Sequence, residues 1–168
     1  MGKEIKKLAN VYVRPAKIEE WEPAMDLVWR TFLRFEADEY AQEGVDNFWE
    51  FIYDETLRRM FCLGQYKLFV ALTENDTIVG VISIRDGNHI SLLFVDEVYH
   101  RQGVGTALVK YVTGFLNREM GKCFVTVNAS PYGVPFYKQV GFQPLGEEVT
   151  ERGIIFTPMR LVIDGKES

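Results

Sequence analysis

The sequence predicts a single α/β domain built around a mixed, mostly antiparallel sheet. Two observations carry this prediction: three short β-branched runs follow one another between turn-forming clusters, and helical patterns precede and follow them. With 168 residues, 47% of them hydrophobic, the chain is large enough to bury a core without disulfide staples. We therefore expect one globular domain spanning residues 1–168.

The first third of the chain predicts a short strand and two helices. Residues 11–14 alternate weakly and stop at Pro15, which suits a strand. Apolar residues three or four positions apart predict an amphipathic helix over residues 18–35. After a break at residues 43–44, a second apolar series predicts one helix over residues 48–61.

The rest of the chain predicts the main sheet and two more helices. Short clusters of Asn, Asp and Gly separate the first three strands of this region, so these strands are expected to be antiparallel neighbours. In chain order we expect strands at 67–72, 78–84 and 90–95, a helix from about 103 to 121, a strand at 124–127, a helix at 134–140, a polar loop at 146–153 and a last strand at 154–162.

Charge and cysteine content limit the function class. The formal net charge of −5 argues against binding to long nucleic acids, which requires clustered Lys and Arg. No run approaches about 18 apolar residues, and the lysine-rich start lacks the apolar core of a signal peptide. Cys62 and Cys123 lack metal-ligand spacing and are interpreted as small buried hydrophobic residues in a reducing compartment. We expect a cytoplasmic protein that uses no metal and binds neither membrane nor nucleic acid.

Residues 92–108 carry the most informative pattern, a strand, a short loop, two glycines and a helix. Gly103 and Gly105 allow a phosphate group to approach the free N–H groups and positive dipole end of that helix. Arg101 adds a positive charge and Thr106 a hydroxyl donor. On these residues alone, an ordinary tight turn is the alternative. The third glycine of a dinucleotide fingerprint and the Gly-Lys-Ser/Thr of an NTPase phosphate loop are both missing.

Two blocks of sequence resemble one known family. Residues 98–107, with His-Arg-Gln-Gly-Val-Gly at 100–105, resemble the acetyl-CoA signature of the GNAT N-acetyltransferase superfamily. Residues 127–142, with an Asn followed by Phe-Tyr-x-x-x-Gly-Phe, resemble its downstream motif. The resemblance covers residues 11–163 and implies a sheet of about six to seven strands, flanked by about four helices and splayed between strands four and five. The signature departs from the family at His100, where Arg or Gln is usual.

The resemblance implies acetyl-CoA as co-substrate and no metal. Phosphate contacts would come mainly from backbone N–H groups, so the change at position 100 leaves the cradle intact. The fourth strand would bulge near residues 93–95, and an N–H group there would bind the acetyl oxygen. Asn128 would contact the pantetheine amides, with capping of the following helix as its other possible role. The implied cofactor-binding residues are Leu93, Phe94, Val95, Asp96, Arg101, Gln102, Gly103, Val104, Gly105, Thr106, Asn128 and Tyr137.

Catalysis requires a proton donor and a base. The family motif places a tyrosine hydroxyl beside the sulfur of CoA, which makes Tyr137 the donor candidate. For the base, side-chain alternation places His89, Ser91 and Leu93 on one strand face, so His89 would lie upstream of the acetyl site. An exposed histidine after a turn is the competing interpretation. The other base candidates are Glu36, Asp38 and Asp96.

The resemblance implies an N-acetyltransferase that moves an acetyl group to a primary amine by direct transfer in a ternary complex. A catalytically weak acyl-CoA-binding sensor or interaction module of the same fold is the alternative. The acceptor would be a small-molecule amine or a peptide amine, and the protein a monomer or homodimer. The acidic and aromatic run at residues 36–50 favours a cationic acceptor such as a polyamine, an amino sugar or a lysine-like side chain. A solvated acidic face is the other interpretation of that run.

Overall fold

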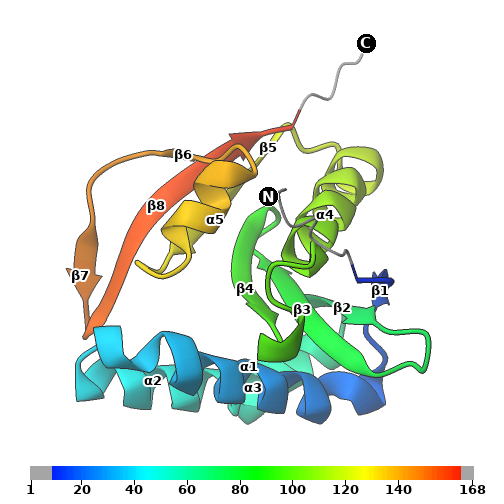
Figure 1. The fold of residues 1–168 in the computed structure, drawn as a ribbon, viewed down its shortest axis with the longest axis horizontal. Coiled ribbons are helices and arrows are strands. Elements are labelled where there is room, and N and C mark those ends of the chain that lie inside the picture. The colour runs from blue at the N-terminus through cyan, green and yellow to red at the C-terminus, as the bar shows by residue number, and fades with distance from the viewer. Residues whose placement is uncertain (1–8, 164–168) are drawn as a thin grey trace, which may run out of the picture.

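One continuous sheet lies between two groups of helices in the computed structural model, which describes residues 9–163 (Figure 1). The strand order is β1-β2-β3-β4-β5-β8-β6, with β7 paired to β8. The strands are β1 (Tyr12–Pro15), β2 (Lys67–Leu72), β3 (Ile78–Arg85), β4 (His89–Val95), β5 (Phe124–Ala129), β6 (Gln143–Pro144), β7 (Val149–Glu151) and β8 (Ile154–Val162). The α-helices are α1 (Trp21–Phe35), α2 (Gln42–Ile52), α3 (Glu55–Cys62), α4 (Val104–Met120) and α5 (Val134–Gln139).

Each face of the sheet buries its own hydrophobic cluster. Alternation along the strands sends Phe69 and Ala71 of β2 towards α4 and α5, while Leu68 and Val70 pack against α1 to α3. The apolar stripe of α1 is buried on this second face. The predicted mixed, mostly antiparallel α/β architecture is therefore confirmed.

The sheet is splayed between β4 and β5, as the resemblance implied. These two strands are parallel and pair only at His89 with Thr126 and at Ile90 with Val127. From there β5 remains paired with β8 to its end, while β4 remains paired with β3. The second half of β4 therefore has no strand partner on its β5 side.

A bulge in β4 lies earlier than predicted. The register runs from Ser83 opposite Leu92 to Ile84 opposite Ile90, which leaves Ser91 as the extra residue. The buried Tyr66 hydroxyl lies 2.7 Å from Ser83 Oγ and 2.9 Å from Ser91 Oγ. The expectation of a bulge near residues 93–95 is corrected, because this hydroxyl chain holds the irregularity at Ser91.

The predicted helix over residues 48–61 is two helices, and the expected break before it lies inside a helix. Chain direction changes at Asp54, whose side chain caps α3 by accepting a hydrogen bond of 2.9 Å from the Thr56 N–H. Gly44 lies inside α2. A larger residue would not fit at this position, because a β-carbon there would lie 2.2 Å from the Gly153 carbonyl oxygen. This glycine permits close packing of α2 on the turn between β7 and β8. No helix within residues 9–163 is long and apolar enough to cross a membrane.

The loop expected at residues 146–153 contains a strand. Residues 149–151 form β7, which pairs with the start of β8. Arg152 and Gly153 both have positive φ, 54° and 79°, as a two-residue hairpin turn requires. The alternating pattern was too short to be recognised as a strand without its partner.

Both cysteines are exposed, so their interpretation as buried residues was wrong. Cys62 ends α3, a helix that buries only Leu57, and Cys123 lies in the connection before β5. Both positions fall at the ends of elements, where the chain reaches the surface.

Candidate active site

The loop between β4 and α4 begins at Asp96, which has a structural role. Its side chain accepts a hydrogen bond from the Val98 N–H at 3.1 Å and forms an ion pair with Arg30 at 2.9 Å. The sequence makes this carboxylate a candidate base and a candidate cofactor contact. Its charge is already compensated by Arg30, so in this structure it anchors the loop against α1.

Two left-handed residues aim the loop at the start of α4. Arg101 and Gly103 have φ of 64° and 85°, and Gly103 is the N-cap. The first backbone hydrogen bond of α4 runs from the Ala107 N–H to the Gly103 oxygen at 2.9 Å. The N–H groups of residues 104–106 come before this bond in the chain and project from the end of the helix. A helix N-terminus of this kind attracts anions.

The predicted cradle residues contribute in different ways. Arg101 is exposed, whereas the Val104 side chain is buried in the core, so Val104 offers only its N–H group. The Gln102 side chain donates to the Val98 oxygen at 2.9 Å. Gly105 has a packing role, because a β-carbon there would lie 3.1 Å from the Phe136 ring. The sequence explains this glycine by phosphate approach, and the contact with Phe136 adds a packing reason to that prediction.

The free edge of β4 exposes backbone groups to the splay. The Asp96 N–H donates to the Val79 oxygen, so in the alternating antiparallel pattern Leu93 and Val95 direct their backbone groups away from β3. His100 Nε2 donates to the Val95 oxygen at 2.7 Å. The residue that departs from the family signature therefore holds the end of this edge. Phe94 points to the other face and packs near Phe48.

Tyr137 lies on α5, in the hydrophobic cluster against which Leu93 and Val95 of β4 pack. Its ring packs edge-on against Phe136 and Phe142, at centroid distances of 5.3 and 5.1 Å, and only 6% of the residue is exposed. Burial, and then the negative charge of Glu36, raise the pKa of the Tyr137 hydroxyl. A hydroxyl in this setting stays protonated at physiological pH and can donate.

Glu36 reaches this site from the opposite face of the sheet. It follows the last residue of α1, and removal from water raises its pKa to about 7. Ser130 lowers that pKa and Glu39 raises it. Burial is the main cause of the raised pKa of Tyr40 and Tyr132, and the Glu36 charge is the second cause for both. Glu36 therefore lies among residues from α5, from the connection before it and from the segment after α1.

His89 is not brought together with Tyr137. The bulge at Ser91 reverses the alternation, so Leu93 packs with the α4 and α5 cluster while His89 faces Thr126 on the other side. The statement that His89 and Leu93 share a face is corrected. The His89 Nδ1 lies 2.7 Å from the Thr126 hydroxyl, and burial lowers its pKa to about 4.

The connection between β5 and α5 completes the mouth of the site. Asn128 pairs with Pro158 of β8 and is exposed, and Ser130, not Asn128, caps the turn by accepting from the Gly133 N–H at 3.0 Å. Phe35 packs against Tyr132 at 5.3 Å and against His100 at 4.7 Å. This aromatic group links α1 to both sides of the splay.

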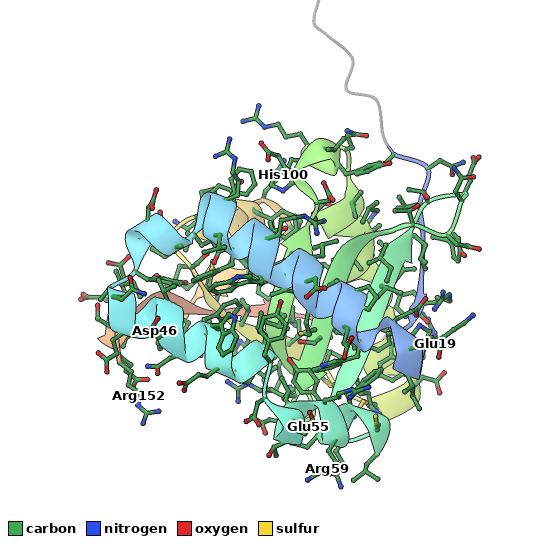
Figure 2. The ribbon with its side chains drawn as sticks, turned by 90° about the horizontal axis from the view of Figure 1, so that it is seen from below. Glu19, Asp46, Glu55, Arg59, His100 and Arg152 are labelled. Carbon is green, nitrogen blue, oxygen red and sulfur yellow. The ribbon has the colours of Figure 1, made fainter. Side chains whose placement is uncertain are left out.

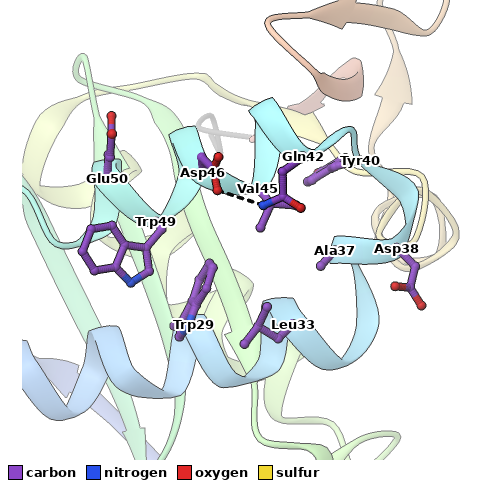
Figure 3. Close-up of a pocket in the computed structure, with 10 residues that line it drawn as sticks. All are labelled: Trp29, Leu33, Ala37, Asp38, Tyr40, Gln42, Val45, Asp46, Trp49 and Glu50. Carbon is purple, nitrogen blue, oxygen red and sulfur yellow. Dashed lines mark hydrogen bonds between the residues drawn. The ribbon is translucent and has the colours of Figure 1, made fainter.

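A groove of about 820 Å³ lies beside this site, between α1 and α2 (Figure 3). Aromatic and acidic side chains dominate its lining, and Asp38, another base candidate, is among them. Figure 2 shows the two helices from below, with Asp46 on α2 and Glu19 near the far end of α1. Among residues 9–163, no group of three or more His, Cys, Asp or Glu side chains is arranged to hold a metal ion.

The family is decided by a match to residues 36–163. These residues, most of the chain, match the model of the acetyltransferase (GNAT) domain. The chain belongs to the GNAT acetyltransferase family. It is similar to the uncharacterized N-acetyltransferase YafP of Escherichia coli K12, with 36% identity over 56% of this chain and 59% of YafP. It is also similar to the peptidyl-lysine N-acetyltransferase YjaB of Salmonella typhimurium, with 31% identity over 60% of this chain and 67% of YjaB.

Solved GNAT structures share this fold. A GCN5-related N-acetyltransferase from Rhodopseudomonas palustris superposes with a TM-score of 0.79 and 22% identity, covering 96% of this chain and 99% of that one. The PaiA N-acetyltransferase of Thermoplasma acidophilum, solved with coenzyme A, gives 0.73 and 15%, covering 91% and 99%. The GNAT fold assigned from the two sequence motifs is thus confirmed.

Proposed function

We propose that this GNAT protein transfers an acetyl group from acetyl-CoA directly to a primary amine, with Glu36 as base and Tyr137 as proton donor. One observation carries the proposal. Glu36 follows Phe35, which packs on Tyr132 in the connection before α5. The buried Tyr137 hydroxyl comes from α5, so it and the Glu36 carboxyl both lie near the opening of the splayed sheet, where burial raises the pKa of each. A group that accepts protons and a group that donates them are what amine acylation requires.

The residues at the splay fit the thioester co-substrate. The N–H groups at the start of α4 and the Arg101 side chain suit a pyrophosphate, and the unpaired edge of β4 suits the pantetheine amides. Acetyl-CoA, when bound, would supply the activated acyl group. The N–H groups of Leu93 and Val95 are the candidates to stabilise negative charge on the acetyl oxygen.

Glu36 is better suited to the role of base than His89. With a pKa of about 7, the Glu36 carboxylate is largely ionised at slightly alkaline pH and still basic enough to take a proton from an ammonium group. The lowered pKa of His89, about 4, makes that imidazole a weaker proton acceptor. Its hydrogen bond to Thr126 also accounts for its position without any catalytic role.

Tyr137 is the proposed partner of the departing thiolate. Its raised pKa keeps the proton on the hydroxyl, so Tyr137 donates a hydrogen bond to the thiolate as the carbon–sulfur bond breaks, and net protonation of the thiolate is balanced by the proton that Glu36 takes from the amine. The two proposed groups thus work in sequence, because Glu36 frees the amine before attack and Tyr137 donates afterwards.

The names of similar proteins support an amine acceptor. The Salmonella YjaB relative is named a peptidyl-lysine N-acetyltransferase, and a structure of similar fold from Vibrio cholerae is named spermidine N-acetyltransferase. A lysine side chain and spermidine share an aliphatic primary amine. That group is the acceptor we propose for this protein.

Calorimetry with acetyl-CoA and CoA, followed by thiol release in the presence of aliphatic amines, tests the proposal. We expect binding of both nucleotides and amine-dependent release of CoA above the hydrolytic background. Absence of binding at millimolar concentration would contradict the cofactor assignment. Binding without release with any amine would favour the acyl-CoA sensor instead.

A further inference from the structure

We infer that the groove between α1 and α2 binds the second, non-reacting ammonium group of an aliphatic diamine acceptor. This inference rests on the proposed acetyl transfer and adds the class of acceptor to it. The groove is lined by Trp29 and Leu33 of α1, by Asp46, Trp49 and Glu50 of α2, and by Tyr40 from the connection between them (Figure 3).

Two indole rings form the walls at one end of this groove. Trp49 is 48% exposed and packs on Tyr53 at a centroid distance of 5.3 Å, while Trp29 stacks on Phe32 at 5.7 Å. The rings come from different helices and are labelled on the two sides of the groove in Figure 3. Trp49 is exposed and Trp29 is half-buried, and aromatic faces held in place by neighbouring rings attract organic cations.

The polar part of the lining is acidic. Asp38, Asp46 and Glu50 line the groove, and the described lining residues include no Lys or Arg. Gln42 Nε2 donates to Asp46 Oδ1 at 2.9 Å, which orients that carboxylate. Acidic side chains along a groove that is walled at one end by indole rings make the groove complementary to an alkylammonium group, both in charge and in its apolar chain.

The groove begins next to the proposed base. Ala37 and Asp38 line it and directly follow Glu36 in the chain. Tyr40 also lines it, and its ring packs against Phe32 at 5.4 Å. A cation held between the indoles is separate from an amine at Glu36, so one acceptor that occupies both places needs two cationic groups joined by an alkyl chain. A volume of about 820 Å³ has room for such a chain.

Binding in the absence of acetyl-CoA tests the groove directly. We would titrate 1,5-diaminopentane and pentylamine, which have the same carbon chain, and follow tryptophan fluorescence and heat. The wild-type protein should bind the diamine at least about tenfold more tightly, and Trp49→Leu and Asp46→Asn should each remove most of that difference. Asp46→Asn keeps an oxygen that can accept from Gln42, so folding should be retained, and thermal unfolding checks this.

Glu19→Gln is the matched control, because it removes one exposed charge from the distant end of the same face. It should leave diamine affinity unchanged. In turnover assays, Trp49→Leu should raise the KM for the diamine, with little change in kcat and no change for pentylamine. Equal affinity for the two amines would overturn the inference, as would equal effects of Glu19→Gln and Asp46→Asn.

The two levels of proposal fail in distinguishable ways. If pentylamine and the diamine support equal thiol release with equal KM, acetyl transfer stands and the groove assignment is wrong. If the diamine binds through Trp49 and Asp46 but no amine releases thiol, the groove is a cation site and the proposed enzyme function is wrong. Tighter groove-dependent binding of a lysine peptide than of any free diamine would also overturn the assignment to a small diamine.

Discussion

Glu36→Gln should stabilise the free protein at neutral and alkaline pH while removing most of its acetyl transfer. Desolvation, assisted by Glu39 and opposed by Ser130, raises the pKa of this carboxyl from its ordinary 4.5 to about 7. That difference corresponds to roughly 3 kcal/mol of unfavourable free energy for the ionised group in the folded state. Glutamine has nearly the same shape and no charge to desolvate, and because Glu36 is half-buried and water still screens its charge, the variant should gain part of this amount, about 1–2 kcal/mol.

The gain should develop between pH 4.5 and about 7. In this range the folded protein retains a proton on Glu36 that the unfolded chain has released, so the wild-type free energy of unfolding falls as pH rises. Above about pH 7 this contribution is constant. His89 acts in the opposite sense. Its pKa is lowered to about 4 in the folded protein, so as pH falls from its ordinary 6.5 the unfolded chain binds a proton that the folded protein does not, and the free energy of unfolding decreases. The difference between wild type and variant isolates the Glu36 contribution.

Urea unfolding followed by tryptophan fluorescence from pH 4.5 to 8.5 measures this difference. Glu39→Gln serves as the control, because Glu39 is exposed and contributes only a secondary effect on Glu36. In turnover, wild-type kcat/KM should rise with an apparent pKa near 7, and Glu36→Gln should lower kcat by about a hundredfold or more. A stability difference that is flat across the pH range would refute the burial argument, and an unchanged kcat would exclude Glu36 as base.

Four further substitutions test other parts of the site. Tyr137→Phe should lower kcat roughly ten- to a thousandfold in thiol-release assays and leave acetyl-CoA affinity by calorimetry nearly intact; unchanged kcat would exclude this hydroxyl from the mechanism. His89→Gln should leave kcat within about twofold, because the imidazole is occupied by Thr126, and a hundredfold loss would restore it as a candidate base. Tyr66→Phe should reduce the free energy of unfolding by about 1–3 kcal/mol and lower kcat at constant acetyl-CoA affinity, since its hydroxyl holds the bulge; unchanged kcat would deny it that positioning role. Gly105→Ala should lower the melting temperature as well as acetyl-CoA affinity, because the added carbon meets an aromatic ring, and a loss of affinity alone would favour the phosphate explanation.

Local patterns in the sequence were sufficient for most elements and for the family. The strands β2 to β5 and the helices α1, α4 and α5 agree with periodicity and turn residues because their own side chains define their buried faces. The glycine loop and the Phe-Tyr block are likewise contiguous in the chain. Asp54 is a residue type that commonly caps helices, and it marks the start of α3. The sequence prediction missed this helix start because Asp54 lies inside a long apolar series.

Features that depend on partners distant in the chain could not be obtained in this way. Gly44 was interpreted as a break because nothing near it in sequence reveals that Gly153 packs against it. The position of the β4 bulge depends on Tyr66, 25 residues away, and a single extra residue there reverses which side chains share a face. The choice of His89 followed from assuming unbroken alternation.

The site itself shows the same division most clearly. Tyr137 was recognised in the sequence because its motif is local, and the acidic run containing Glu36 was visible as composition. What distinguishes Glu36 from the other carboxylates of that run is its desolvation beside Ser130 and its coupling to Tyr137, where the end of α1 meets the splayed sheet. Sequence determined which ionisable groups were present, and only the tertiary structure decided which of them lost water, because desolvation is a property of the surroundings and not of the residue.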